Sequence, residues 1–358
     1  MHYPVIKLGD KKIQCALIII STSLLFSLVY INSTNIEFSN LSDDVPLEIN
    51  DLISNETYEK LFFHTEIQCT DLNYINKTVD GTDSLDTYVK VCEKSDKHED
   101  NKSAPNLCEY CPFKEPNFLK ERKPFVALAS FGGSGNSWTR ELLESLTGIY
   151  TGSVYDDVFG EFPGSKQCPL RGKVYIVKTH AKTSQTYHSE CSKQDSTIQY
   201  QKAMYILRNP YESIMSAFNL DMTSNKVGFA NQSDFQSEAW RKYVKERSKG
   251  WRIMTTYWLT TFNKPVYTIV YENLTKNTLR ELNDIGRFLR LQPTYIHLYC
   301  AKHCLKVKYH RVRKPYWMNK ETVFDKLLKE VVNSEIKALV NKIKNMDNIV
   351  KHLNGYVL

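Results

Sequence analysis

The chain has 358 residues, of which 42% are hydrophobic and 12% aromatic. This length allows one large domain or two ordinary ones, and the apolar content supports a packed core, which excludes wholesale disorder. The formal net charge of +7 favours an anionic cofactor, an acidic substrate or a membrane surface, without selecting among them.

The first predicted element is a membrane-spanning helix over residues 13–31. This stretch, IQCALIIISTSLLFSLVYI, carries no charged residue and is long enough to cross most of a bilayer. Lys7, Lys11 and Lys12 precede it, so the positive-inside rule makes residues 1–12 a cytoplasmic tail. A cleaved signal peptide is the rival interpretation, but the run is long for one and lacks a small-x-small cleavage pattern. We expect a retained signal-anchor of a type II membrane protein.

Glycosylation sequons agree with this topology, because every N-x-S/T site lies after the apolar run. The sequons are at Asn32, Asn40, Asn55, Asn76, Asn101, Asn231 and Asn273. Residues 32–121 hold five of them, are rich in Asn, Asp, Ser and Lys, and show weak periodicity. We expect this segment to be a glycosylated luminal stem.

The cysteines also indicate an oxidising compartment. One of the nine, Cys15, lies in the apolar run, and the remaining eight form an even set, as disulfide pairing requires. The spacing Cys108-x-x-Cys111 allows zinc or redox chemistry, but no second such pair or His pair stands at ligand spacing, so disulfides are favoured. The local pairings that the sequence suggests are Cys168–Cys191 and Cys300–Cys304.

From residue 122 onward the sequence predicts one α/β domain, 122–358. Short apolar runs alternate with helical patterns, at 125–131, 173–178, 203–208 and 266–272. Continuous apolar strands followed by amphipathic helices indicate a central parallel sheet covered on both faces. In such sheets the site lies at the carboxyl ends of the strands.

A glycine-rich turn follows the first of these runs, in VALASFGGSGNSWTRELLESLTG (126–148). A strand, a turn of small residues and then a helix form an anion cradle, because backbone amides and the helix N-terminus face the ligand. The turn lacks the Lys of a Walker A loop, which argues against a nucleotide triphosphatase, and it does not fit G-x-G-x-x-G either. A tight structural turn without a ligand is the remaining alternative.

Three further motifs follow in chain order: VYIVKTH, AMYILRNPYESIMSAF and VYENLTKNTLRELNDIGRFL. Together with SFGGSGNSW they resemble the sulfotransferase superfamily, whose P-loop-like fold binds 3′-phosphoadenosine-5′-phosphosulfate (PAPS). Within that superfamily, SGNSWTRELLESLTGIYTGSVYDD is most similar to the membrane-anchored WSC-domain sulfotransferases. The chain shows no convincing WSC module, so we do not transfer what such modules contribute.

The resemblance implies a role for each motif and needs no metal. The loop would hold the 5′-phosphate, Arg208 and Ser216 would grip the 3′-phosphate, and His180 would take the acceptor's proton. The basic run 306–314 falls where relatives bring a basic loop over the 3′-phosphate, so Arg311, Arg313 and Lys314 are further candidates. The residues expected to bind at the loop are Gly132, Gly133, Ser134, Gly135, Asn136, Ser137 and Trp138.

One departure from the familiar loop is that Gly133 stands where a Lys is usual. We expect another cation to neutralise the leaving group: Lys178 as the first candidate and Arg140 as the second. The base is also open to an alternative, since some glycan sulfotransferases use a carboxylate. The reserve candidates for that role are Asp156, Asp157 and Glu161.

The resemblance and the predicted anchor together imply a Golgi type II sulfotransferase that sulfates a hydroxyl of a glycan on a glycoprotein, glycolipid or proteoglycan. A protein tyrosine acceptor is the second choice, and a catalytically silent luminal protein that binds the nucleotide or carbohydrate is the alternative. A kinase-like phosphotransferase is disfavoured by the absent Walker Lys. Nucleic acid is not an expected partner, and a homodimer is left open.

Overall fold

The structure is a computed structural model that describes most of the chain from residue 107 onward and four short strands near the N-terminus. The described residues beyond those strands are 107–156, 162–183, 185–191, 197–224, 227–305 and 314–358. The chain divides into two units, Met1–Gln68 and Cys69–Leu358. Most of the predicted stem lies outside the described residues.

In the first unit, short strands form two antiparallel pairs. They are β1 (Ile19–Thr22) with β2 (Leu25–Leu28) and β3 (Ile31–Asn32) with β4 (Asn35–Ile36). Two of these strands fall inside the segment 13–31, for which the sequence predicts a helix. Among the described residues, no helix combines the length and apolar character that crossing a bilayer requires.

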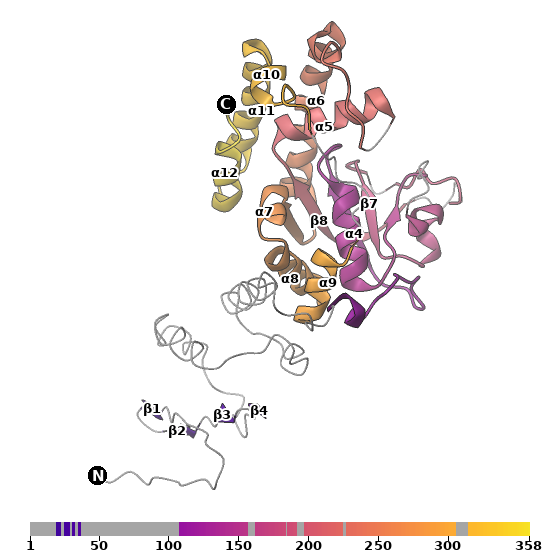
Figure 1. Cartoon of the computed structure of the whole chain (residues 1–358), viewed down its shortest axis with the longest axis vertical. Helices are drawn as coiled ribbons and strands as arrows, with labels where there is room; N and C mark the ends of the chain where they lie inside the picture. The colour runs from indigo at the N-terminus through magenta and orange to yellow at the C-terminus, as the bar shows by residue number, and fades with distance from the viewer. Residues whose placement is uncertain are drawn as a thin grey trace, which may run out of the picture. The chain divides into compact units, whose positions relative to one another are not determined.

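The second unit is built around a five-stranded sheet in which the strand order is β6-β7-β5-β8-β9 and every pairing is parallel. Figure 1 labels two of these strands, β7 and β8. The bounds are β5 Phe125–Ser130, β6 Gly152–Ser153, β7 Ile176–Thr179, β8 Tyr200–Leu207 and β9 Val266–Val270. This confirms the predicted parallel sheet. The two-residue β6 has no apolar run and was not expected.

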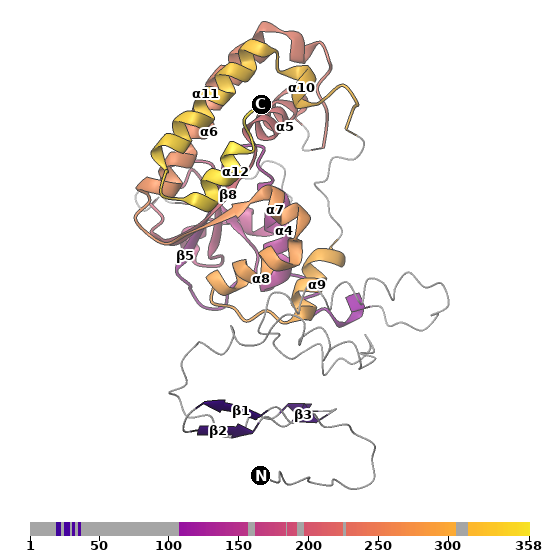
Figure 2. The ribbon, with the colours of Figure 1, turned by 90° about the vertical axis from the view of Figure 1, so that its left-hand side faces the viewer.

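The helices cover both faces of this sheet (Figure 2). Alternate residues of β5 enter different cores: Ala127 and Ala129 pack with side chains of α5, α6 and α11, whereas Val126 and Leu128 pack with those of α4, α8 and α9. The bounds are α4 Asn136–Thr147, α5 Pro210–Thr223, α6 Glu238–Thr256, α7 Tyr271–Lys276, α8 Thr278–Phe288, α9 Tyr295–His303, α10 Lys320–Val323, α11 Lys326–Lys342 and α12 Asp347–Asn354. Side chains of a strand alternate between the two faces of the sheet. Because both faces are buried here, the strand has a continuous apolar sequence, as in FVALAS.

Short helical turns complete the fold. They are the 3₁₀ turns η2 Leu107–Tyr110, η3 Pro163–Lys166, η4 Pro169–Arg171 and η6 Asp234–Gln236, and the π-helical turn η7 Tyr257–Thr261, which continues α6. Trp251 and Trp258, in the aromatic series that follows α5, are buried in the core.

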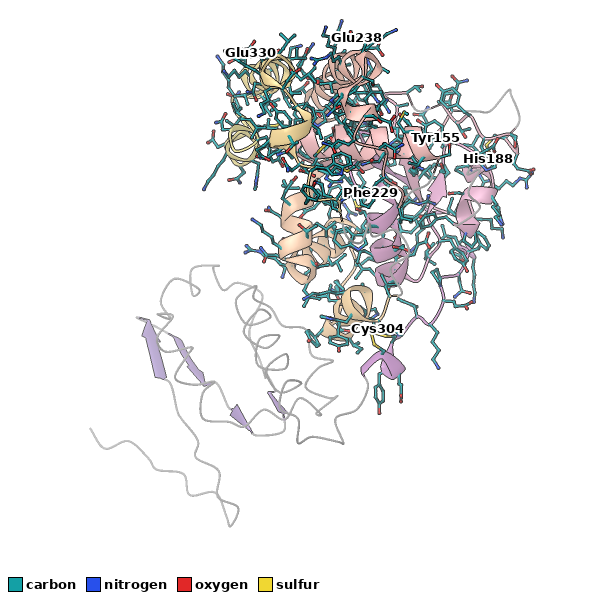
Figure 3. The ribbon with its side chains drawn as sticks, turned by 45° about the horizontal axis from the view of Figure 1, so that its top comes forward. Tyr155, His188, Phe229, Glu238, Cys304 and Glu330 are labelled. Carbon is teal, nitrogen blue, oxygen red and sulfur yellow. A yellow bond between two sulfur atoms is a disulfide. The ribbon has the colours of Figure 1, made fainter. Side chains whose placement is uncertain are left out.

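Three disulfides join cysteines in the part of the second unit that the structure describes. Cys108–Cys304 and Cys111–Cys300 join η2 to α9, and Cys168–Cys191 closes a shorter loop; Figure 3 shows the sulfur bond at Cys304. The predicted Cys168–Cys191 pair is confirmed, and the predicted Cys300–Cys304 pair is wrong. Residues at i and i+4 project from the same face of a helix, so these two cysteines each reach across to η2 instead of to each other.

Candidate active site

The ends of four parallel strands bring the sequence motifs to one edge of the sheet. β5 ends at Ser130, β7 at Thr179, β8 at Leu207 and β9 at Val270. The residues that follow directly are Phe131, His180, Arg208 and Tyr271. Because all four strands run in the same direction, the glycine loop and the candidate base and phosphate-binding residues start from the same edge.

The glycine loop takes a conformation that strongly favours glycine. Gly133 and Gly135 have φ of 78° and 88°, in the left-handed region. A Cβ on Gly133 would collide with the carbonyl oxygen of Ser213 on α5, and one on Gly135 would collide with the ring of Tyr271. The loop therefore packs its bare backbone against both α5 and α7, which explains why two of its residues are glycine.

The helix that follows the loop begins without a side-chain cap. Gly135 is the N-cap of α4 and forms no side-chain capping hydrogen bond, so amides of the first turn are left for another acceptor. The hydroxyl of Ser134 is buried with no hydrogen-bond partner in the described structure. Asn136 donates to Leu128 O at 3.3 Å and to Ser130 Oγ at 3.1 Å, which ties the start of α4 back to β5.

His180 is held as a neutral ring with a defined tautomer. Its Nδ1 lies 2.7 Å from the carbonyl oxygen of Ser130, and since a carbonyl oxygen can only accept, Nδ1 carries the proton and Nε2 the lone pair. Burial, followed by the positive charge of Lys178, lowers the pKa of His180 to about 3, with smaller contributions from Arg247 and Arg140. Nε2 is therefore the nitrogen that can accept a proton.

Tyr155 supports this histidine and was not singled out from the sequence. The backbone N–H of His180 donates to the Tyr155 hydroxyl at 3.2 Å, and the two rings stack with centroids 6.1 Å apart. The exposed ring of Tyr187 also stacks on Tyr155, with the ring centroids 5.9 Å apart. Tyr155 is labelled in Figure 3. The aromatic row thus runs from the candidate base towards solvent.

Lys178 lies on β7 two residues before His180. It is opposite Leu128 of β5 and Ser153 of β6 in the sheet register, and its carbonyl accepts the N–H of Val154 at 3.0 Å. Its side chain is half-buried. The structure thus places the first-choice cation close enough to shift the pKa of His180.

Arg208 contacts the glycine loop itself. Its Nη1 donates to the carbonyl oxygen of Gly133 at 2.7 Å, and its guanidinium lies over the ring of Tyr271, 4.3 Å from the centroid. Its Nε is buried and has no hydrogen-bond partner within the described residues. Ser216 stands two turns along α5 and is half-buried.

The segment after Arg208 is fixed by capping and by a carboxylate. The side chain of Asn209 caps α5 by accepting from Tyr211 N, and Pro210 occupies the first helical position, where proline is favoured. Glu272 accepts from Asn209 N at 3.0 Å and from the Tyr356 hydroxyl at 2.7 Å. The Y-E-N-L segment therefore positions the arginine strand through Glu272.

Arg140, the second-choice cation, is engaged elsewhere. Its side chain is 1% exposed, and it donates to Thr151 Oγ1, Thr151 O and Ser165 Oγ at 2.7, 2.9 and 2.6 Å. Thr151 in turn donates to Glu144. This network joins α4 to η3 and to the residue that precedes β6, so the role that the geometry gives Arg140 is structural.

The reserve carboxylates and the basic run are only partly described. Asp156 accepts from the N–H and hydroxyl of Ser189 at 3.0 Å and lies 3.2 Å from His188 Nδ1, so it holds a turn together. Lys314 pairs with Glu212 at 3.3 Å on the surface. The remaining candidates lie outside the described residues: Asp157, Glu161, Arg311 and Arg313.

The donor set fits a ligand with two phosphate groups. The buried Ser134 hydroxyl and Arg208 Nε lack partners in the described part of the chain, and both can donate to phosphate oxygens. The amides at the start of α4 and the bare backbone at Gly133 and Gly135 offer the close approach that an anion needs.

Comparison with known proteins agrees with the motifs. The chain is 31% identical over 214 residues to WSCD family member GA21586 of Drosophila pseudoobscura pseudoobscura, covering 56% of this chain and 63% of that protein. It is 32% identical over 190 residues to WSCD family member CG9164 of Drosophila melanogaster, covering 51% and 56%. This chain is similar to the WSCD family. The expected resemblance is therefore confirmed, and the chain spans less than two thirds of the length of these relatives.

No family model matches the chain. Among solved structures, mouse sulfotransferase SULT7A1 complexed with PAP shares 18% identity, covering 66% of this chain and 90% of that chain, with a TM-score of 0.44. Retinol dehydratase in complex with androsterone and PAP shares 15%, covering 62% and 82%, with a TM-score of 0.39. At these scores the likeness adds nothing to the fold described above.

One residue close to the loop was missed by the sequence analysis. Arg247 lies on α6, and its guanidinium is 5.5 Å from the ring centroid of Phe131. No local motif marks it, because its position depends on how α6 crosses the strand ends.

Proposed function

We propose that this protein is a PAPS-dependent sulfotransferase that sulfates a hydroxyl of a glycan. The observation that supports the proposal most strongly is that three features lie at one edge of the sheet. They are the glycine loop, the Ser134 hydroxyl and Arg208 Nε without partners among the described residues, and the neutral ring of His180. Each of these groups matches one requirement of sulfuryl transfer: a held 5′-phosphate, a held 3′-phosphate and a base.

The residues of this chain divide the work. Loop amides and the Ser134 hydroxyl bind the 5′-phosphate, and Arg208 with Ser216 binds the 3′-phosphate. When bound, PAPS supplies the sulfuryl group, whose S–O bond to the 5′-phosphate breaks as a bond from sulfur to the acceptor oxygen forms. Nε2 of His180 takes the proton of the acceptor hydroxyl, and Lys178 stabilises the negative charge that grows on the leaving phosphate oxygen.

The compartment and the acceptor are part of the same proposal. An apolar run preceded by lysines, sequons beyond it and cysteines in disulfides support a Golgi type II membrane protein with a luminal site. A luminal enzyme of this kind meets the hydroxyls of glycoproteins, glycolipids and proteoglycans. Protease protection of the second unit in sealed microsomes tests this topology.

The activity is tested by incubating the full-length chain with sulfur-labelled PAPS and a panel of glycan acceptors plus a tyrosine peptide. We expect label on a glycan, and a His180→Gln variant that binds PAP as wild type does but transfers about a hundredfold more slowly or less. Label on the peptide alone would move the acceptor to protein tyrosine. PAP binding without label on any acceptor would contradict the enzyme and leave a silent binder.

A further inference from the structure

Arg247 lies on the face of α6 that meets the strand ends. Its helix neighbours Gly250 and Trp251, at i+3 and i+4, share this face. A Cβ on Gly250 would lie 3.7 Å from the ring of Phe131, and the indole N–H of Trp251 donates to Arg208 O at 3.2 Å. Arg247 is therefore directed at the place where the glycine loop and the arginine strand begin.

The Arg247 guanidinium lies beside the loop. Its Nη2 is 3.7 Å from the position that a Cβ on Gly132 would take, and its Cζ is 5.5 Å from the centroid of Phe131 and 5.1 Å from that of Tyr243. Its positive charge also contributes to the low pKa of His180. The charge thus acts on both the loop and the candidate base.

The hydrogen bonds of Arg247 are incomplete. Its Nε is buried and has no partner within the described residues. Its Nη2 is 3.4 Å from Asp221 Oδ2, an oxygen that also accepts the Tyr243 hydroxyl at 2.6 Å. A buried guanidinium N–H without an acceptor is unfavourable, and an anion at the loop would relieve this.

The loop itself has no room for a cation at Gly133. The φ of 78° and the carbonyl oxygen of Ser213 exclude any side chain there. The usual loop lysine is therefore excluded by the close packing of the loop on α5, and the charge that the reaction needs must reach the loop from another element.

We propose that Arg247 binds the 5′-phosphate end of the nucleotide and supplies from α6 a second positive charge, besides that of Lys178, because a side chain is excluded from the loop at Gly133. The inference rests on the proposed function and adds a binding residue to it. Asp221 and Tyr243 hold the guanidinium in place before the ligand arrives, and the phosphate then competes with Asp221 for the same donors.

Nucleotides that lack one phosphate test this assignment. The dissociation constants of adenosine 3′,5′-bisphosphate, 5′-AMP and 3′-AMP are measured by calorimetry on the full-length chain. For Arg247→Ala we expect about tenfold weaker binding of the first two, which carry a 5′-phosphate, and unchanged binding of 3′-AMP. Lys249→Ala, an exposed cation on another face of α6, is the matched control and should change none of them.

A second variant predicts the opposite sign. Asp221→Asn removes the negative charge that competes for Arg247, so the bisphosphate should bind about twofold more tightly or better. A variant that merely damaged the fold would weaken binding instead. If wild type binds the bisphosphate but Arg247→Ala binds it equally well, or loses all three ligands alike, Arg247 does not contact the 5′-phosphate. If wild type binds none of the three, the proposed function itself is contradicted.

Discussion

Nη1 of Arg208 donates a 2.7 Å hydrogen bond to the carbonyl oxygen of Gly133, so the arginine expected at the 3′-phosphate also braces the loop expected at the 5′-phosphate. The two halves of the site are therefore coupled. A cation–π contact with Tyr271, the first residue of α7, holds the guanidinium 4.3 Å from the ring centroid.

Because of this coupling, Arg208→Gln should weaken the binding of both mononucleotides, but unequally. We expect 3′-AMP affinity to fall about tenfold or more, through loss of the charge-assisted contact, and 5′-AMP affinity to fall less, because the loop only loses its brace. Calorimetry on the full-length chain measures both. An unchanged 3′-AMP affinity would show that Arg208 serves the loop alone.

Adjacent glycines should differ sharply in their tolerance of alanine. At Gly133 a methyl group meets Ser213 and the backbone is left-handed, so Gly133→Ala should lower the free energy of unfolding by about 2 kcal/mol or more. At Gly132 the nearest atom is 3.7 Å away and the φ is ordinary, so Gly132→Ala should stay within about 0.5 kcal/mol. Urea unfolding compares them, and equal losses would contradict the loop geometry.

His180 should titrate far below an ordinary histidine. Its pKa of about 3 lies below the pKa of 6.5 in the unfolded chain. Between about pH 3 and 6.5, His180 is therefore protonated in the unfolded state and neutral in the folded state. The contribution of His180 therefore lowers stability as the pH falls from about 6.5 towards 3, and His180→Gln removes that part of the acid sensitivity.

NMR titration of the His180 ring gives the pKa directly. Since Lys178, Arg247 and Arg140 all help to lower it, adenosine 3′,5′-bisphosphate should raise it by neutralising charge near the loop. A ring that titrates near 6.5 in the free protein would contradict the half-buried, cation-flanked environment.

Arg140 should matter for stability and not for the ligand. Replacing it with Leu leaves Thr151 and Ser165 without their donor and should cost roughly 3 kcal/mol of unfolding free energy. Arg280→Leu, at an exposed position on α8, is the control and should cost little. Folded Arg140→Leu protein should bind adenosine 3′,5′-bisphosphate with wild-type affinity; a selective loss of affinity would return Arg140 to the site.

The two disulfides between η2 and α9 should not be additive. Each closes a long loop, with sequence separations of 196 and 189, and either alone keeps that loop closed. Removing one pair by Cys→Ser should therefore lower the free energy of unfolding by about 2 kcal/mol. Removing the second pair from that variant opens the loop and should lower it by about 5 kcal/mol more. Denaturant unfolding of the single and double variants checks this, and equal, additive losses would contradict it.

The strand ends were predictable because each motif follows an apolar run directly. His180, Arg208 and the glycine loop are placed by β7, β8 and β5, and parallel pairing alone brings them to one edge. The sequence also suggested Cys168–Cys191, whose partners are close in the chain. These features depend on local order and on one general rule of sheet packing.

What sequence could not supply is the packing between distant elements. Arg140 was considered for the site, yet its helix face meets Thr151 and Ser165. Arg247 belongs to α6, and no motif marks its contact with Phe131. The cysteines of η2 pair with cysteines about 190 residues away. Each of these positions depends on a contact between residues that are distant in the sequence, so the spacing of residues along the chain does not predict it.

The most direct measurement is a crystal structure of the protein with adenosine 3′,5′-bisphosphate. We predict the 5′-phosphate on the amides between Gly133 and Ser137, and the 3′-phosphate on Arg208 and Ser216. A nucleotide bound elsewhere, with the loop amides facing solvent, would contradict the site from which the whole function is inferred.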